Sequence, residues 1–337
     1  MLSLTEERGI PMRKHIKHAW IAAAAIVALA GGLIVAVGST DGIQPVTPEE
    51  AKELLAAVRL GCDTAAASVS SSAGVVTLHE WNWRANGDLL ETETTYTVAL
   101  KGERYRAAVE TKYLTNEWSS ANSPGTIQKT ILGYDGEKVT RYEPLRGYAA
   151  IANLDSGIGR ELRNAKILAI SPGIGAPTFP EIPPTPDNPD PGSRVLGRQT
   201  VNGEDCVVVD TVSTAATAKG TQTMIFRSWI ALQKGFSLVK AEGKVRGGMF
   251  GEGETLIAQI EAQPRECADD LWGISQVQQE EHMVDDSGRI YLSRRATTDF
   301  SKDYAINAPV TEDMLTVTLP SGTKVDNELI DSQYTIP

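Results

Sequence analysis

The segment Thr221–Arg246, with the sequence TQTMIFRSWIALQKGFSLVKAEGKVR, decides the fold. It reads as a strand, a short turn at 232–235 and a returning strand. One face of the first strand carries Met224, Phe226, Ser228 and Ile230, and the other carries Ile225, Arg227, Trp229 and Ala231. Apolar side chains on both faces predict a strand that lies inside a sheet and not at its surface.

Further hairpins flank this segment on both sides. From Gly74 onward, alternating apolar and polar runs are separated by Asn86-Gly87, Asp135-Gly136 and Asn202-Gly203, and such dipeptides are the strongest short-range hairpin signal. Two long strands, 273–283 and 289–300, complete the pattern. Because strands that follow one another usually pair, we expect an up-and-down antiparallel meander curled into an open barrel.

Two helices are expected beside the strands. Thr47 followed by Pro48 and Glu50 is a helix-start signal, and an apolar stripe continues to about Ala67. A second helical pattern covers roughly 155–169. The predicted fold class is therefore mainly β with a few helices (α+β), an open antiparallel half-barrel covered by helices.

The N-terminal region predicts a membrane anchor. Residues 1–18 are polar and basic, and residues 19–38 form an uncharged apolar run long enough to cross a bilayer as a helix. Basic residues before the run and acidic ones after it place the N-terminus in the cytoplasm. A cleaved signal peptide ending at Ala36-Val37-Gly38 is the alternative. Both interpretations export residues 39–337, which we expect to form a single domain with a Pro-rich insertion at 171–192; a domain linker is the other interpretation of that insertion.

Composition excludes several classes of protein. The 337 residues carry a net charge of −11 and show no basic cluster beyond the first 20, which argues against nucleic-acid binding. The three cysteines, Cys62, Cys206 and Cys267, are too scattered for a zinc site. A Cys206–Cys267 disulfide in an oxidising compartment stays an alternative to packed, free thiols.

No motif in the chain carries catalytic chemistry. The sequence lacks a nucleophile elbow, and His79 and His282 each lie inside a strand pattern without a neighbouring nucleophile. The glycine-rich run 247–253 lacks the Lys-Ser/Thr of a phosphate loop. The carboxylate pairs Glu91/Glu93 and Glu280/Glu281 are most simply solvated charges. We therefore expect no catalytic, metal or cofactor site and no enzyme activity.

Apolar surface is the remaining functional signal. A curled sheet buries its concave face by filling it, by covering it with helices or by binding an apolar ligand. The residues predicted to line a ligand cavity are Trp81, Trp83, Tyr96, Val98, Phe226, Ile230 and Phe236. In the central hairpin, Phe226 and Ile230 are expected to face the cavity because Arg227 lies on the other face.

Two stretches resemble a known family. The pattern from Trp229-Ile230 through Gly235-Phe236 to Lys240 is similar to the central hairpin of LolA-like proteins, the periplasmic lipoprotein carriers and their outer-membrane lipoprotein-sorting relatives. The ending LTVTLPSGTKVDN…YTI, 315–336, is similar to the tail of large sorting-protein-like members. The resemblance covers 48–337 loosely and implies an open antiparallel barrel with an apolar cavity for acyl chains. It carries over no individual functional residue.

Together these signals predict a membrane-anchored, extracytoplasmic protein of the cell inner membrane, with its main domain in the periplasm. Its expected partner is a lipid or lipoprotein acyl chain, in a role such as lipoprotein sorting or envelope maintenance. The alternative is an envelope-stress sensor that binds a protein partner, as relatives in the family do with anti-sigma regulators.

Overall fold

The computed structural model describes residues 42–169, 192–217, 220–268, 271–285, 287–300 and 303–337. The basic segment 1–18, the predicted membrane span 19–38 and residues 171–191 of the Pro-rich insertion lie outside these ranges. Within them, no helix combines the length and the apolar character needed to cross a membrane.

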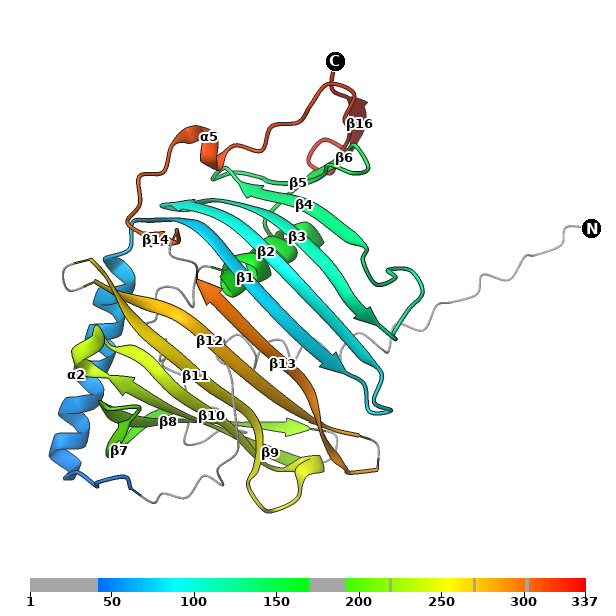
Figure 1. Ribbon diagram of the computed structural model, residues 1–337. Helices are drawn as coiled ribbons and strands as arrows, with labels where there is room; N and C mark the ends of the chain where they lie inside the picture. The colour runs from blue at the N-terminus through cyan, green and yellow to red at the C-terminus, as the bar shows by residue number, and fades with distance from the viewer. Residues whose placement is uncertain (1–41, 170–191, 218–219, 269–270, 286, 301–302) are drawn as a thin grey trace, which may run out of the picture.

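The described strands form one large sheet that stays open, as the sequence predicts (Figure 1). Its two ends are the strands β7 and β16, and the order from end to end is β16-β15-β6-β5-β4-β3-β2-β1-β13-β12-β11-β10-β9-β8-β7, with β14 pairing beside β1. The strands are β1 Ser71–Trp83, β2 Leu89–Lys101, β3 Arg104–Asn116, β4 Ile127–Tyr134, β5 Val139–Glu143, β6 Tyr148–Ala152, β7 Gly192–Val201, β8 Glu204–Thr217, β9 Gly220–Ala231, β10 Ser237–Gly247, β11 Thr255–Ala268, β12 Leu271–Val284, β13 Ile290–Phe300, β14 Ala305–Ile306, β15 Lys324–Asn327 and β16 Ser332–Thr335.

Two meanders meet where β1 pairs with β13. Strands β1 to β6 each pair with the next along the chain, and so do β7 to β13. The antiparallel junction runs from Val76 opposite Phe300 to Asn82 opposite Arg294. At the far end, β15 lies parallel to β6. These two long-range pairings are absent from the meander that the sequence predicts, and they join the N-terminal and C-terminal parts of the chain into one sheet.

The central hairpin forms as expected from strands β9 and β10. The turn contains the short 3₁₀ helix η1, Leu232–Lys234, followed by Gly235 at a φ of 62°. Phe236 also has a positive φ, 61°, which is rare for a large side chain. A second 3₁₀ turn, η2 (Gly248–Phe250), follows β10.

Helix α2, Pro48–Ala67, covers the β7–β9 end of the sheet (Figure 1). Its start is the one predicted: the Thr47 hydroxyl oxygen accepts a hydrogen bond from the Glu50 backbone N–H at 3.2 Å, and Pro48 occupies the first turn. The buried helix residues Leu54, Val58 and Cys62 pack against Val207, Val209 and Ile230 of the sheet.

Helix α3, Gly157–Ala169, covers the other meander. It contacts β3, β4, β5 and β6. Its residue Leu162 is buried in the largest apolar cluster of the protein, together with Leu132 and Val139. The predicted helix at 155–169 is thus confirmed within two residues.

Both helices lie on the same face of the sheet, which we call the inner face. Strand register shows this: Val209, beneath α2, lies opposite Ser228, which lies opposite Ala241, and Ala241 belongs to the cluster that contains Leu162 of α3. Figure 1 shows α2 and α3 behind the strands, so the viewer sees the other, outer face.

The outer face is partly covered by a C-terminal helix and carries ion pairs. The short helix α5, Glu312–Leu315, packs there, where Val310 and Leu315 contact Ala73 and Ala99. Further along, the β8–β10 strands carry an ionic ladder, in which Arg227 donates two hydrogen bonds to the buried Asp210, at 2.8 and 3.0 Å.

All three cysteines are free. Cys206 packs in an apolar cluster with Trp229 of the outer face, whereas Cys267 packs against the inner-face cluster. The alternative of a Cys206–Cys267 disulfide is therefore not realised, because the two side chains lie in different clusters.

The docking of α2 can be tested at two neighbouring positions of the helix. Val58 is fully buried and Leu60 is 70% exposed. We expect Val58→Ala to lower the free energy of unfolding by about 2 kcal/mol, because it removes two buried carbon groups and leaves a cavity. Leu60→Ala should change it by less than about 0.5 kcal/mol. Urea denaturation measures both, and equal losses would show that α2 does not pack through this face.

Thiol reactivity offers a second test. Burial raises the pKa of both the Cys62 and the Cys206 thiol to about 12. Because the thiolate is the reactive form and its share falls as the pKa rises, both should react with iodoacetamide at pH 8 about a thousandfold more slowly than exposed thiols. Timed alkylation with peptide mass spectrometry, in buffer and in urea, measures this. Rapid labelling of Cys206 in the native protein would contradict the structure.

Candidate functional site

The centre of the inner face is a strip of small side chains. It crosses strands β10 to β13, and three of its residues belong to the same apolar cluster as Leu162 of α3. The strip consists of Ala241, Gly243, Ala258, Ala262 and Ala296. Gly243 lies opposite Ala258 and Phe226, and a Cβ added to it would come within 3.3 Å of the Phe226 ring. All of these residues except Ala258 are buried, and the buried Ile260 lies between Ala258 and Ala262 on β11.

A polar patch adjoins the strip on strands β1, β13 and β12. Arg294 lies between two carboxylates: its Nε and Nη2 atoms both lie 2.8 Å from Glu80 Oε1, and its Nη1 donates to Glu281 Oε1 at 2.8 Å. Glu80 lies two residues from Leu78 and Arg294 two residues from Ala296, so each shares the inner face with that neighbour; Glu281, opposite Arg294, lies on the same face. We call Glu80, Arg294 and Glu281 the inner ion triad.

Arg294 stays charged within the ion triad. Burial alone would lower the pKa of the Arg294 guanidinium, and the neighbouring Glu80 and Glu281 carboxylates raise it above its ordinary value. With two carboxylates and one guanidinium, the triad has a net charge of −1. The Arg294 side chain is 16% exposed, Glu80 22% and Glu281 34%, so the charges are only partly screened by solvent.

Hydroxyl and amide groups surround the triad. Thr92 lies directly opposite Glu80, the Thr94 and Thr111 hydroxyls hydrogen-bond at 3.1 Å, and Gln279 donates to Glu281 Oε1. Tyr96 marks the boundary with the apolar part, where burial raises the pKa of its phenol well above the ordinary value. The inner face is thus apolar toward β14 and polar toward the β1–β2 turn.

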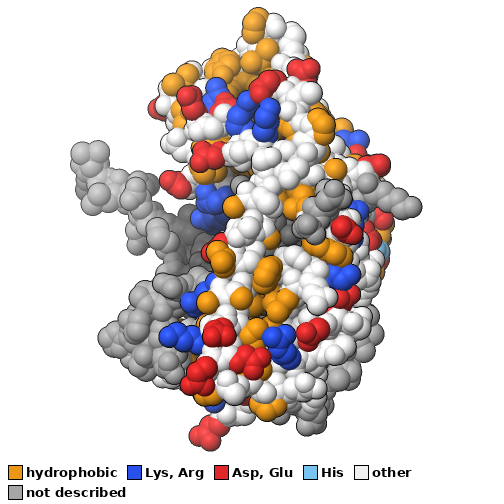
Figure 2. Space-filling view, turned by 90° about the vertical axis from the view of Figure 1, so that its left-hand side faces the viewer, with side chains coloured by type: hydrophobic (Ala, Val, Ile, Leu, Met, Phe, Trp, Pro, Cys, Tyr) orange, Lys and Arg blue, Asp and Glu red, His pale blue; other side chains and the backbone are white. Residues whose placement is uncertain are grey.

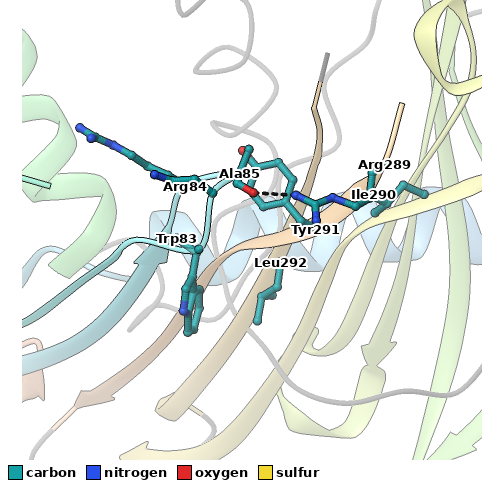
Figure 3. A pocket seen from close by; sticks show the side chains of 9 residues that line it. Trp83, Arg84, Ala85, Arg289, Ile290, Tyr291 and Leu292 are labelled. Atoms are coloured by element: carbon teal, nitrogen blue, oxygen red, sulfur yellow. Dashed lines mark hydrogen bonds between the residues drawn. The ribbon is translucent and has the colours of Figure 1, made fainter. Parts of the chain in front are cut away.

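An open pocket of about 370 Å³ lies just beyond the ion triad, at the ends of β1 and β13 (Figure 3). Its lining comes from 83–87 and 289–292. The Arg289 guanidinium donates to the Ala85 carbonyl oxygen at 2.6 Å and so ties the two turns together. Across the second turn, hydrogen bonds from the Ser287 hydroxyl and from backbone N–H groups lower the pKa of Asp285 to about 2.

The structure separates the seven residues that the sequence groups into one cavity. Tyr96 and Val98 belong to the large inner-face cluster, Ile230 and Phe236 pack beneath α2, and Phe226 lies against Gly243 on the inner face. Phe226 and Ile230 thus lie on the face that carries the helices, and Arg227 lies on the outer face.

Trp81 and Trp83 lie apart from the other five residues. They alternate with Leu78 and Glu80 along β1 and so point to the outer face. There Trp81 stacks on His79 at a ring distance of 3.9 Å, and His79 Nε2 lies 2.9 Å from Glu91 Oε1. Trp83 lines the pocket at the end of the strand.

The ion triad is the feature that the sequence analysis missed. Glu280 and Glu281 look like a pair of solvated charges, but alternation sends them to opposite faces, where Glu280 pairs with Arg295 and Glu281 with Arg294. Strand alternation is the signal that could have found it. Glu281 lies four residues from the buried Val277, and Arg294 lies two residues from Ala296, so each pair shares one face of its strand.

The described residues contain no cluster of His, Cys, Asp and Glu side chains that could hold a metal ion. On the side of the molecule that Figure 2 shows, acidic and basic side chains are interspersed and no basic stretch stands out. The same view shows hydrophobic side chains gathered at the upper end, over the C-terminal elements.

No model of a protein family matches the sequence, and no curated protein matches it. Among solved structures, a DUF1329 family protein from Desulfovibrio piger is similar over 77% of this chain and 97% of its own, at 12% identity and a TM-score of 0.37. An outer membrane lipoprotein-sorting protein domain from Vibrio parahaemolyticus aligns over 80% and 97%, at 10% identity and 0.35. A LolA superfamily protein from Nitrosomonas europaea aligns over 78% and 97%, at 13% identity and 0.34.

The last two structures are named for lipoprotein sorting and for the LolA superfamily. With TM-scores below 0.4 they are not a basis for assigning an activity.

The ion triad can be tested through stability. Arg294→Met removes the cation between Glu80 and Glu281 and leaves two partly buried carboxylates without it. We expect the free energy of unfolding to fall by about 2–3 kcal/mol, less than for a fully buried pair because the groups are partly solvated. Lys129→Met, which breaks the exposed Lys129–Glu110 pair, should cost less than about 1 kcal/mol. Denaturant titration compares the two, and an unchanged Arg294→Met variant would show that the triad contributes nothing to the fold.

Proposed function

We propose that this chain is a membrane-anchored, extracytoplasmic binding protein, without enzyme activity, that holds a lipid or lipoprotein acyl chain on its inner face. The observation that supports this most directly is the strip of small apolar side chains on the inner face. An acyl chain offers no hydrogen bonds, so it needs an apolar surface; Ala258 is the half-buried member of the strip, beside the buried Gly243 and Ala241.

The division of the inner face suits an amphiphilic ligand. A lipid has an apolar tail and a polar end, and the face has an apolar strip beside the ion triad of Glu80, Arg294 and Glu281. Burying the tail would contribute about 0.8 kcal/mol for each methylene group removed from water.

Anchoring at the cell inner membrane rests on the sequence. The uncharged run 19–38 with basic residues before it supports a single crossing with the N-terminus in the cytoplasm and the sheet in the periplasm. The sequence resemblance to lipoprotein carriers supports the same compartment, with a role in lipoprotein sorting or envelope maintenance.

A second candidate is an envelope-stress sensor that binds a protein partner. Exposed apolar side chains support it: Leu145, Leu329 and Ile330 are 67%, 40% and 66% exposed near the C-terminal strands, where Figure 2 shows hydrophobic atoms gathered. Apolar groups in such a patch often mark a protein contact.

Photolabelling in cells that produce the full chain distinguishes the candidates. Cells are fed an alkyne-tagged, photoactivatable fatty acid, irradiated and analysed by peptide mass spectrometry. Acyl-chain binding predicts adducts on inner-face residues of β10–β13. Ala258→Trp, which fills the strip at a half-buried position, should reduce these adducts about tenfold, because displacing two methylene contacts costs about 1.6 kcal/mol.

Thr297→Trp is the matched control, since Thr297 is half-buried on the outer face of β13, and its adducts should equal those of the wild type. Adducts confined to 19–38, which would report only membrane lipid around the anchor, would contradict acyl-chain binding. Capture of a stable protein partner, with no adduct on the inner face, would favour the sensor.

A further inference from the structure

The described chain is tied into the fold from its first residues. The Gln44 backbone N–H donates to the Arg198 carbonyl oxygen of β7 at 2.8 Å, and the Arg198 N–H donates to the Gln44 carbonyl oxygen at 3.0 Å. Ile43 packs in the outer-face cluster with Trp229, and Val46 packs against the cluster beneath α2. This part of the chain therefore cannot leave β7 without losing two hydrogen bonds and two packing contacts.

Very little chain separates this tie from the predicted membrane anchor. The apolar run ends at Gly38, and only residues 39–41 lie between it and Gly42, where the described chain begins. Four steps from one Cα to the next span at most about 15 Å. Gly42 lies against the fold, because a Cβ added to it would lie 3.1 Å from the Gln199 Nε2 of β7. An anchored chain therefore holds the β7 edge of the sheet close to the bilayer surface.

The opposite edge of the sheet lies far from this point. Among the described residues, β7 and β16 end a row of fifteen paired strands. Neighbouring strands lie about 4.8 Å apart, so the row extends about 65 Å along the curved sheet. In Figure 1 the described chain begins, in dark blue, at the lower left near β7, and β16 lies at the top. Because a bilayer excludes the protein, a body held at one edge has its other edge farther away on average, even when it pivots.

Charge opposes a flat contact between the sheet and the bilayer. Residues 1–38 contain four basic and two acidic side chains, so the net charge of −11 for the whole chain leaves −13 on residues 39–337. At the β7 edge, Arg198 pairs with both Glu50 and Asp205, at 3.6 and 3.4 Å, and this group has a net charge of −1. Anionic lipid head groups therefore repel the domain, including this edge. The connection to the anchor, and not affinity for lipid, keeps the edge near the bilayer.

We propose that the short connection between anchor and fold orients the domain on the membrane, with the β7 edge facing the bilayer and the β15–β16 edge farthest from it. This orientation rests on the proposed function, because it requires an anchor that is not cleaved. The surface around Gly42 and Thr200 meets lipid head groups. The exposed apolar side chains Leu329 and Ile330, at the far edge, are out of reach of the bilayer that holds the anchor.

Energy transfer from a dye on the domain to acceptor-labelled lipids measures the orientation in vesicles that hold the full chain. Cysteines are introduced one at a time as Thr200→Cys on β7, Glu103→Cys in the β2–β3 turn and Glu328→Cys in the β15–β16 turn, all at exposed positions. Alternating strand direction places all three at the same end of the sheet, so their distances from the bilayer differ through strand order.

Transfer should be at least about fivefold stronger from Thr200→Cys than from Glu328→Cys, with Glu103→Cys between them, because strand order separates the positions by tens of ångströms. The chain without an added cysteine gives the background, which should be low because Cys62 and Cys206 are buried. If Thr200→Cys does not accumulate, Gln233→Cys in the exposed turn between β9 and β10 takes its place.

Lengthening the connection is the matched control. Twenty Gly and Ser residues inserted after Asp41 leave every described residue unchanged and add a flexible chain with an end-to-end distance of about 25 Å. The ratio of transfer from Thr200→Cys to transfer from Glu328→Cys should then fall at least about twofold. An unchanged ratio would overturn the proposal, because the surface of the domain and not the connection would then set the orientation.

Flotation with the vesicles separates this inference from the proposed function. A chain that floats and gives equal transfer from Thr200→Cys and Glu328→Cys, or stronger transfer from Glu328→Cys, would overturn the orientation and leave the anchor standing. A chain that does not float, or that is cut after Gly38, has no anchor, and this result would overturn both the anchoring and the orientation.

Discussion

The pairing of β1 with β13 is the constraint on which the rest of the structure depends. Residues 76–82 and 294–300 lie at opposite ends of the chain, and their backbone ladder is the seam between the two meanders. Apolar side chains of both meanders meet in the cluster that contains Leu162 of α3, and those of β8 and β9 pack beneath α2. Only across this seam do Glu80 and Arg294 meet, so the fold and the candidate site have the same origin.

Because side chains alternate along each strand, the two faces of the sheet carry different kinds of residues. On the outer face the β8–β10 strands carry paired charges, such as Asp210 with Arg227, and the C-terminal segment adds an apolar cover around Leu315. On the inner face the helices cover large side chains, and the strip on β10–β13 consists of small ones. Glu280 and Glu281 show how sharp the division is, because one step along β12 moves a carboxylate from one face to the other.

Local signals predicted much of this architecture. The Thr47 cap, the turn dipeptides and the alternation of the central hairpin each depend on residues close in sequence, and they gave α2, the hairpins and the face of Ile230. The long-range pairings of β1 with β13 and β6 with β15 have no local signal, because any exposed strand edge can accept any other. Trp81 was predicted to line the cavity because it is a large aromatic residue on a strand. Such a side chain can equally stack on a neighbour on the outer face, as Trp81 does on His79. The ion triad could not be assembled before the seam was known.

The seam also fixes the order in which the chain can mature. Because β13 is made long after β1, the N-terminal meander must wait with one row of unpaired backbone N–H and C=O groups, an edge open to any other extended chain. Closing so long a loop is slow compared with forming hairpins. A protein built this way is most vulnerable to aggregation during its own synthesis, and a chaperone that shields the free edge of β1 would act before the two halves of the sheet have paired.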